Sequence, residues 1–380
     1  MSESLVDSVL TRDIRARIAA DTAEGTGLPN LCYTSDEWLK LENERVFART
    51  WMLAGFCHDI PNPGDACPVT VAGMPILLVR DAAGEVRAFH NVCRHRGAML
   101  LERACSGLKG LTCPYHSWSY GLDGRLKARP NFFGSGQHDH KPPAEAPAMI
   151  PVRHAIWHDL IFVNISGDAV DFDKHWAPFA ERTEKYDFGA LRYAKTLNFD
   201  VSGNWKLIYE NAFDTYHIPT LHPSFYSFFN ITDAPEFEGA WLYGTSRVPE
   251  SEERGFGLPL HRALDDETRR TEWFFILFPT SIIQIFTNHL AVFQLDVLAP
   301  GRTLERIHLY FVENAAFDST YEKPRQDVYD MWNKLNPEDF GVVESMRRAR
   351  HSCGFDGGAL APYWDPAIQH FARLTSEAIG

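Results

Sequence analysis

The sequence is short of positive charge and contains no cluster of basic residues. Its 380 residues include 37 Lys and Arg against 50 Asp and Glu, which gives a formal net charge of −13. Binding to nucleic acid or to an anionic membrane surface depends on positive charge, so we expect neither partner. The first 20 residues are polar and charged, so we expect no signal peptide or membrane span there.

The sequence also lacks the paired cysteines that are typical of disulfide-rich secreted proteins. Two of its seven cysteines belong to motifs described below. The other five have no paired spacing: Cys32, Cys57, Cys67, Cys105 and Cys353. An odd number of unpaired cysteines favours free thiols in a reducing compartment, so we expect a cytoplasmic protein.

Two short motifs each combine one cysteine with one histidine. They are Cys93-x-His95 and Cys113-x₂-His116, and seventeen residues separate them. Two thiolates and two imidazoles are the ligands of a Rieske [2Fe–2S] centre. Cys93 and Cys113 would bind one iron, and His95 and His116 the other. A structural Cys₂His₂ zinc site is the alternative, although zinc fingers usually pair Cys with Cys and His with His.

A second group of candidate ligands follows further along the chain. At helical spacing Glu210, Asp214 and His217 share one face, and we expect Pro219 to end this helix. The following turn would then deliver His222. Two imidazoles placed in this way suit a mononuclear non-haem iron, which needs a carboxylate as its third ligand. Ordinary surface or core histidines are the alternative.

The best source of this third carboxylate is the segment 337–346. Pro337 and the acids after it are typical of a helix start. At about 100° per residue, Asp339 lies on the apolar face of that helix, whereas Glu338 and Glu344 point elsewhere. A buried acid is usually paired or bound to a metal, so we expect Asp339 to be the third ligand. The alternative is an acid that stabilises a helix N-terminus.

Taken together, these motifs resemble the catalytic α-subunit of the Rieske non-haem iron oxygenases. The resemblance runs over nearly the whole chain, from about Tyr33 onwards. The segment 337–352, PEDFGVVESMRRARHS, is most similar to the carnitine and choline monooxygenase branch. That branch carries Glu before its first His ligand, whereas this chain has Asp214, as the aromatic-ring-hydroxylating members do.

The resemblance implies an α+β fold with an all-β Rieske domain and a helix-grip catalytic domain built on a long antiparallel sheet. We expect N-terminal helices in residues 1–45 that pack on the catalytic domain, the Rieske domain in 46–165 and the catalytic domain in 166–380. Three apolar runs are typical of buried strands of the long sheet: Trp273–Phe278, Ile282–Phe286 and Leu290–Leu298.

The resemblance also implies the cofactors and partners. We expect a Rieske [2Fe–2S] cluster, a mononuclear Fe(II), O₂, and electrons from NAD(P)H. A separate reductase, with or without a ferredoxin, would supply the electrons, because no Gly-rich dinucleotide fingerprint follows a strand here. In this family the electron crosses between subunits, so we expect a homotrimer or a multiple of trimers. Asp214 would then bridge His217 to His116 of the partner subunit. A helix acid that caps Asn204 or Trp205 is the alternative role for Asp214.

Seven apolar residues are candidates for the substrate pocket, although any of them could be ordinary core: Phe213, Phe225, Phe229, Phe275, Ile283, Phe286 and Phe293. An apolar pocket suits a small aromatic substrate, and hydroxylation of such a molecule by a dioxygenase or monooxygenase is the main hypothesis. Aromatic rings could equally cage a quaternary ammonium group, which would make the protein a monooxygenase that hydroxylates or demethylates a carnitine-, choline- or betaine-like compound.

Two alternatives belong to other functional classes. A Rieske electron carrier without oxygenase activity would account for the cluster motifs but not for the Asp214 constellation. A zinc-stabilised binding protein would account for neither electron transfer nor the late acid. The number of iron atoms per chain and the visible spectrum distinguish all three.

Overall fold

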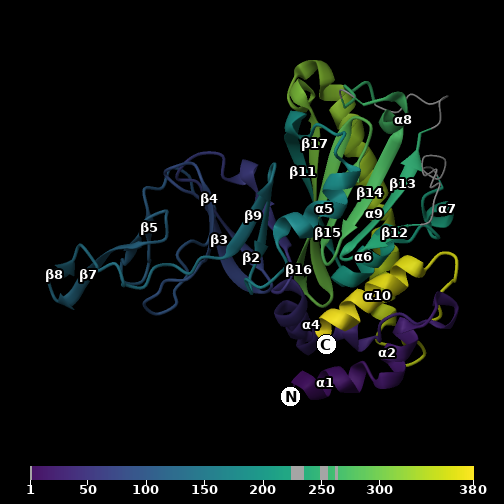
Figure 1. Ribbon diagram of the computed structural model, residues 1–380, viewed down its shortest axis with the longest axis horizontal. Helices are drawn as coiled ribbons and strands as arrows, with labels where there is room; N and C mark the ends of the chain where they lie inside the picture. The colour runs from purple at the N-terminus through teal and green to yellow at the C-terminus, as the bar shows by residue number, and fades with distance from the viewer. Residues whose placement is uncertain (1, 224–234, 249–255, 262–263) are drawn as a thin grey trace. The chain divides into compact units, whose positions relative to one another are not determined.

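The computed structural model describes residues 2–223, 235–248, 256–261 and 264–380, which form two compact units (Figure 1). The larger unit comprises Met1–Val46 and Asp173–Gly380, and the inserted unit comprises Phe47–Phe172. Because the inserted unit interrupts the larger one, both ends of the chain belong to the larger unit.

The inserted unit is built from three small antiparallel sheets. Their strands, in spatial order, are β1 (Met52–Phe56), β10 (Leu160–Asn164) and β9 (Arg153–Trp157), then β2 (Ala66–Val71), β3 (Met74–Arg80) and β4 (Val86–His90), then β5 (Leu111–Thr112), β6 (Ser119–Tyr120), β7 (Leu126–Gly134) and β8 (Gln137–Asp139). The central strand β3 has a continuous apolar run, Ile76 to Val79, that is wholly buried. A continuous run of this kind is expected where both faces of a strand are covered.

The larger unit contains one seven-stranded antiparallel sheet. Its strands, in spatial order, are β11 (Leu191–Val201), β17 (Arg302–Val312), β16 (His289–Ala299), β15 (Ser281–Ile285), β14 (Thr271–Leu277), β13 (Trp241–Arg247) and β12 (Glu236–Glu238). The predicted α+β fold with a long antiparallel sheet is confirmed, and the three apolar runs form β14, β15 and β16.

Helices cover both faces of this sheet. On one face, Phe179 of α5 (Phe172–Arg182) packs edge-on against Phe275, with ring centroids 4.7 Å apart. On the other face, Trp332 of the long helix α9 (Glu322–Ala349) packs against Phe293 at 5.3 Å. Side chains alternate between the faces of a strand, so neighbouring apolar residues on one strand belong to two different layers.

The larger unit contains further α-helices. They are α1 (Ser2–Val9), α2 (Arg12–Ala19), α3 (Leu31–Thr34), α4 (Asp36–Glu42), α6 (Trp205–Phe213), α7 (Ile218–Leu221), α8 (Asp266–Arg269) and α10 (Pro366–Ile379). The N-terminal helices pack on this unit, since Arg373 of α10 donates to the carbonyl of Ala20 at 2.6 Å. No helix in the described part of the chain is both long enough and apolar enough to span a membrane.

A fully buried ion pair fixes α6 against α4. Lys206 Nζ lies 2.6 Å from Glu42 Oε1, and both side chains are almost completely excluded from solvent. The indole of Trp205 donates to the other oxygen of Glu42 at 3.0 Å. Buried charges persist only where they are paired and hydrogen-bonded, so this contact specifies how α6 is placed.

Candidate metal centres and active site

The two Cys-His motifs form loops with the same hydrogen-bond pattern. In each loop the cysteine carbonyl accepts from the amide four positions further on: Cys93 from Gly97 and Cys113 from Ser117, both at 3.0 Å. The cysteine amide donates to the carbonyl five positions further on, at 2.8 Å in both loops. Gly97 and Ser117 occupy equivalent positions and both have positive φ, 79° and 56°. The two loops are therefore related by repeated geometry as well as by sequence.

The cysteines of both loops lie in one buried apolar cluster, at 2% exposure each. The Tyr120 hydroxyl accepts a hydrogen bond from the Arg94 amide at 3.0 Å and lies 3.4 Å from Cys93 Sγ. Because its oxygen already accepts from an amide, its proton is available to the sulfur. A hydrogen bond to a cluster sulfur stabilises negative charge there and raises the reduction potential.

The histidines of the two loops also lie together. The rings of His95 and His116 have centroids 4.7 Å apart, and His95 stacks on Trp118 at 4.7 Å. The Nδ1 atom of His116 is buried and has no hydrogen-bond partner. A buried imidazole nitrogen without a partner is costly, and a metal bound to it would remove that cost. The four side chains thus fit the predicted [2Fe–2S] centre.

The second candidate centre begins at the end of α6. Asn204 caps the start of this helix by accepting from the Lys206 amide at 2.9 Å, and the helix ends at Phe213 with Asp214 as its C-cap. The prediction that the helix continues to Pro219 is wrong. The chain extends at Asp214 instead, where ψ is 110°.

A separate short helix, α7, carries the two histidines at its ends. His217 occupies the position before its first residue and His222 the position after its last. Pro219 lies in the first turn of α7 rather than after a helix, and the first turn tolerates proline because its amides have no helical partner.

The late acid comes from the middle of α9. This helix runs from Glu322 to Ala349, so Pro337 lies inside it and the predicted helix start there is wrong. Trp332, Asn336 and Asp339 are spaced at i, i+4 and i+7, which places them on one face.

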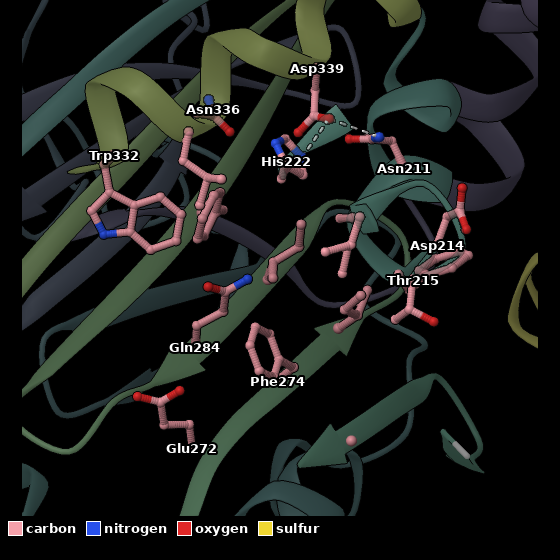
Figure 2. A pocket seen from close by; sticks show the side chains of 18 of the residues that line it. Asn211, Asp214, Thr215, His222, Glu272, Phe274, Gln284, Trp332, Asn336 and Asp339 are labelled. Carbon is pink, nitrogen blue, oxygen red and sulfur yellow. Dashed lines mark hydrogen bonds and ion pairs between the residues drawn. The ribbon is translucent and has the colours of Figure 1, made fainter. Parts of the chain in front are cut away.

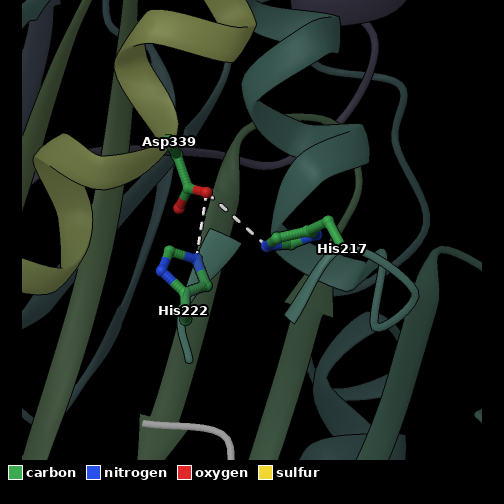
Figure 3. Close-up of side chains that lie close together, drawn as sticks. All are labelled: His217, His222 and Asp339. Carbon is green, nitrogen blue, oxygen red and sulfur yellow. Dashed lines mark ion pairs between the residues drawn. The ribbon is translucent and has the colours of Figure 1, made fainter. Parts of the chain in front are cut away.

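Asp339 lies where the two histidines converge (Figure 3). Its Oδ1 atom lies 3.5 Å from His217 Nε2 and 3.0 Å from His222 Nε2. Asn211 of α6 donates to the same oxygen at 3.3 Å. One ligand atom from each of the three residues lies within 4.8 Å of the others. This is the donor set of a two-histidine, one-carboxylate facial triad for non-haem iron.

The electrostatics of this site favour a bound cation. Burial raises the pKa of Asp339, although His222 and His217 oppose the shift. Burial lowers the pKa of His217, but Asp214 and Asp339 outweigh it, so that this pKa is raised overall. A largely buried carboxylate beside two imidazoles needs a compensating positive charge. A divalent cation among the three side chains would supply this charge and would stabilise the carboxylate together with neutral imidazoles.

Both histidines have a second carboxylate on the ring nitrogen that faces away from Asp339. His217 Nδ1 lies 3.3 Å from Asp214 Oδ2, without hydrogen-bond alignment. His222 Nδ1 lies 2.7 Å from Glu338 Oε2 and is hydrogen-bonded to it. The prediction that Glu338 points away from the site is therefore wrong. The only signal for it in the sequence is its position next to Asp339.

Comparison with known proteins identifies the family. A family model described as "Ring hydroxylating alpha subunit (catalytic domain)" matches residues 188–380, just over half of the chain. A Rieske [2Fe-2S] domain model matches residues 50–134. The chain belongs to the Rieske non-haem iron oxygenases, as a catalytic α-subunit. It is an oxidoreductase, and the cofactors of this family are a Rieske [2Fe–2S] cluster and a mononuclear iron.

The oxygenase is similar to several characterised proteins. It is 28% identical over 346 residues to the carnitine monooxygenase oxygenase subunit of Acinetobacter baumannii, covering 87% of this chain and 86% of that protein. It is 26% identical to the chloroplastic choline monooxygenase of Amaranthus tricolor, covering 92% and 76%.

Solved structures show the same fold. A crystal structure of a quaternary ammonium Rieske monooxygenase superposes with a TM-score of 0.78 at 23% identity, covering 96% of this chain and 98% of that one. Naphthalene 1,2-dioxygenase from Rhodococcus sp. superposes with the same TM-score at 18% identity, covering 97% and 99%.

A cavity of about 1080 Å³ adjoins the His217, His222 and Asp339 cluster in the oxygenase. It lies between one face of the seven-stranded sheet and helices α6, α7 and α9. In Figure 2, Trp332, Asn336 and Asp339 point into it from α9, opposite Phe274 of β14 and Gln284 of β15. The last two residues are paired across their strands and therefore share a face.

The structure separates the predicted pocket residues into three groups. Phe213, Phe286 and Phe293 line the cavity. Phe275 and Ile283 do not, because they lie on the opposite face of the sheet, where Phe275 packs against Phe179. Their neighbours Phe274 and Ile282 face the cavity instead. Phe225 and Phe229 lie outside the described residues.

Proposed function

We propose that this oxygenase is a monooxygenase of quaternary ammonium compounds. The observation that carries this proposal is the combination of aromatic rings and a buried carboxylate in the cavity beside the iron site. The relatives named above for carnitine and choline support the same substrate class. We therefore favour a cationic substrate over the aromatic hydrocarbon of the main sequence-based hypothesis.

Glu305 is the carboxylate in question. It lies on β17, lines the cavity and is only 3% exposed. Its Oε2 atom accepts a hydrogen bond from Asn336 of α9 at 2.8 Å. Burial raises the pKa of Glu305 to about 7, although the hydrogen bond from Asn336 opposes the shift. A cation bound nearby would lower this pKa and be held by the resulting negative charge.

Aromatic rings line the same cavity as this carboxylate. Trp332 packs against Phe293 with centroids 5.3 Å apart and against Phe286 at 5.9 Å, and all three line the cavity. The faces of aromatic rings attract cations, most strongly where water is excluded. A trimethylammonium group has no hydrogen to donate, so rings and a nearby carboxylate are its natural partners.

The charge of the cavity agrees with this substrate class. Among its described lining residues are one ammonium group, Lys334, and six carboxylates: Asp214, Glu272, Glu305, Asp327, Asp330 and Asp339. Two of these acids belong to the proposed metal site and its surroundings. Of the other four, Asp327 is ion-paired with Lys323, which does not line the cavity, and the remaining three acids still outnumber the single ammonium group, a balance that would attract a cation.

The reaction consumes one O₂, two electrons and two protons, hydroxylates one carbon of the substrate and releases one water. A bound iron would supply the activation of O₂. His217, His222 and Asp339 would hold it at the wall of the cavity, and Glu305 with the rings would orient the substrate toward it. The carnitine relatives are named as oxygenase subunits, so we infer a separate reductase as the electron donor.

A substrate panel tests this proposal. The enzyme, reduced through a reductase or chemically, is supplied with O₂ and either a trimethylammonium compound (choline, carnitine or glycine betaine) or an aromatic hydrocarbon such as naphthalene. We expect product and O₂ uptake in equal amounts with at least one of the first group. Turnover confined to the aromatic compounds would refute the proposed substrate class and support the alternative.

A further inference from the structure

We propose that Glu338 is a positioning residue for the iron, acting through His222. The proposal rests on the assignment of His217, His222 and Asp339 as iron ligands, and it concerns how tightly that iron is held rather than which substrate is oxidised. The family match assigns no role to this glutamate.

The contact itself is short, and its imidazole side is shielded from solvent, whereas the Glu338 side chain is 26% exposed. Glu338 Oε2 lies 2.7 Å from His222 Nδ1, and the side chain of His222 is only 4% exposed. The other ring nitrogen, Nε2, lies 3.0 Å from Asp339. The imidazole of His222 therefore lies between two carboxylates, one at each nitrogen.

The chemistry of the imidazole gives the two carboxylates different roles. A neutral imidazole carries one proton, and a metal binds the nitrogen that lacks it. A carboxylate at Nδ1 accepts a hydrogen bond from the N–H group there, which leaves the lone pair of Nε2 on the side of Asp339, where a metal would bind. It also fixes the rotation of the ring, since a ring turned away would lose the hydrogen bond. Partners of this kind raise ligand basicity and metal affinity.

The two acids are consecutive residues of one helix. Side chains one residue apart on α9 diverge by about 100°, so Glu338 and Asp339 can reach opposite nitrogens of the same ring. His222 lies at the end of the short helix α7, whereas Asp339 lies inside the long helix α9, so the backbone of His222 is less constrained. A contact at both nitrogens compensates for that freedom.

His217 is held differently. Its Nδ1 lies 3.3 Å from Asp214 and is not aligned for a hydrogen bond. The better-formed contact thus belongs to Glu338 and not to Asp214. We infer that Glu338 contributes more to metal affinity, whereas Asp214 remains the candidate for electron transfer between subunits.

Metal titration of the full-length protein tests the proposal. The mononuclear iron is removed with a chelator while the Rieske absorption is retained, and Co²⁺ is then titrated against wild type, Glu338→Ala, Glu338→Gln and the control Glu344→Ala. Glu344 is on the same helix but exposed to solvent. We expect Glu338→Ala to weaken Co²⁺ binding by about 10–100-fold. Glu338→Gln should weaken it less, because its amide oxygen can still accept a hydrogen bond from the Nδ1–H group.

Two results would overturn the proposal. The first is that both Glu338 variants bind Co²⁺ as tightly as Glu344→Ala; should Glu338→Ala fail to fold, Glu338→Gln decides by the same comparison. The second is that thermal unfolding of the metal-depleted variants occurs at a lower temperature while their Co²⁺ affinity is unchanged, which would make Glu338 merely structural. Because no substrate enters this measurement, its outcome is independent of the substrate panel.

Discussion

At the scale of single residues, Asp339 connects the side chains of the proposed iron site, because its Oδ1 atom lies close to both imidazoles and to Asn211. It is largely buried, and in the described part of the chain its close polar neighbours are two imidazoles and the amide of Asn211. A carboxylate in such a place needs a compensating positive charge. Iron would supply that charge while it uses the same oxygen as a ligand.

Removal of Asp339 should therefore empty this site and leave the other one intact. We expect Asp339→Ala, like His217→Ala and His222→Ala, to lose turnover while iron falls from about three to about two atoms per chain. The Rieske absorption should persist, because Cys93 and Cys113 are untouched. Iron analysis with a visible spectrum measures both quantities, and Glu344→Ala is the control. Full activity in Asp339→Ala would contradict the assignment of Asp339 as the third iron ligand.

Glu305 should make substrate binding depend on pH. Burial holds its pKa at about 7, so the carboxylate is mostly neutral one unit below that pH and mostly charged one unit above it. We expect the KM for a trimethylammonium substrate to fall as the pH rises from about 6 to about 8. Glu305→Gln should raise KM and remove this fall. A wild-type KM that is flat over this range, or that rises, would argue against a role for Glu305 in cation binding.

The structure brings the predicted iron ligands together, but it corrects several predictions about their neighbours. Ligand identity follows from donor chemistry and spacing, which the chain displays directly. Phe275 and Ile283 were assigned to the wrong face because both faces of their strands are apolar, one against α5 and one toward the cavity. When a strand has no polar face, the alternation of its side chains does not show which residues face the cavity and which face α5. Helical periodicity identifies only the residues on the apolar face of α9. Glu338 lies outside that face, and its contact with His222 is visible only in the folded structure.

At the scale of elements, the packing of α6 against α9 brings Asn211 to Asp339. The chain also approaches α9 closely at Gly203, between β11 and α6, where a Cβ atom would collide with Val343 of α9. The backbone there has little room to move, since Gly203 O accepts from Thr303 at 3.0 Å and Ser202 O accepts from Arg347 at 2.9 Å.

Gly203→Ala should therefore force the two helices apart. We expect a loss of about 1–3 kcal/mol in the free energy of unfolding, with weaker binding of the mononuclear metal. In the double variant Gly203→Ala/Val343→Ala, the smaller residue makes room, so its cost should be less than the sum of the two single costs. Denaturant unfolding of the four proteins measures this coupling. Simple additivity would mean that the two positions do not meet.

Helix boundaries near the site were harder to predict than the strands. The strands of the long sheet are runs of apolar residues with strong β-propensity, and such runs have few alternative structures. Pro219 and Pro337 were interpreted as a helix end and a helix start. Pro219 instead lies in a first turn and Pro337 inside α9, where the packing of Tyr329, Trp332 and Val343 outweighs the cost of one lost hydrogen bond.

At the scale of the whole molecule, the Rieske ligands belong to the inserted unit and the iron ligands to the larger one. The homotrimer and the route of the electron remain predictions from the family resemblance. If Asp214 links two subunits, Asp214→Asn should keep both metals and normal reduction of the cluster, but turnover should nearly stop.

Mixed oligomers test this route. We expect His116→Cys and Asp214→Asn to be inactive separately and to regain part of the activity when co-assembled. Activity returns only if an intact cluster on one chain can serve an intact Asp214 on another. Co-assembly confirmed by differently tagged chains, with no recovery of activity, would exclude electron transfer between subunits.

The substrate is difficult to predict from the sequence. The described residues that line the cavity come mainly from five strands and three helices that are distant along the chain. Glu305 and Trp332, for example, line one cavity only because β17 and α9 pack together. Their chemistry becomes interpretable once their neighbours are known, and it favours a cation.

The central claim is that the cavity recognises positive charge, and a matched pair of substrates tests it most directly. The pair consists of the trimethylammonium compound that the enzyme oxidises best and the same molecule with carbon in place of the quaternary nitrogen. Chemically reduced enzyme is mixed with O₂ and each compound, and hydroxylated product is measured by mass spectrometry after a single turnover. We expect product from the charged compound and almost none from its neutral isostere. Equal yields from both would contradict recognition of the cation.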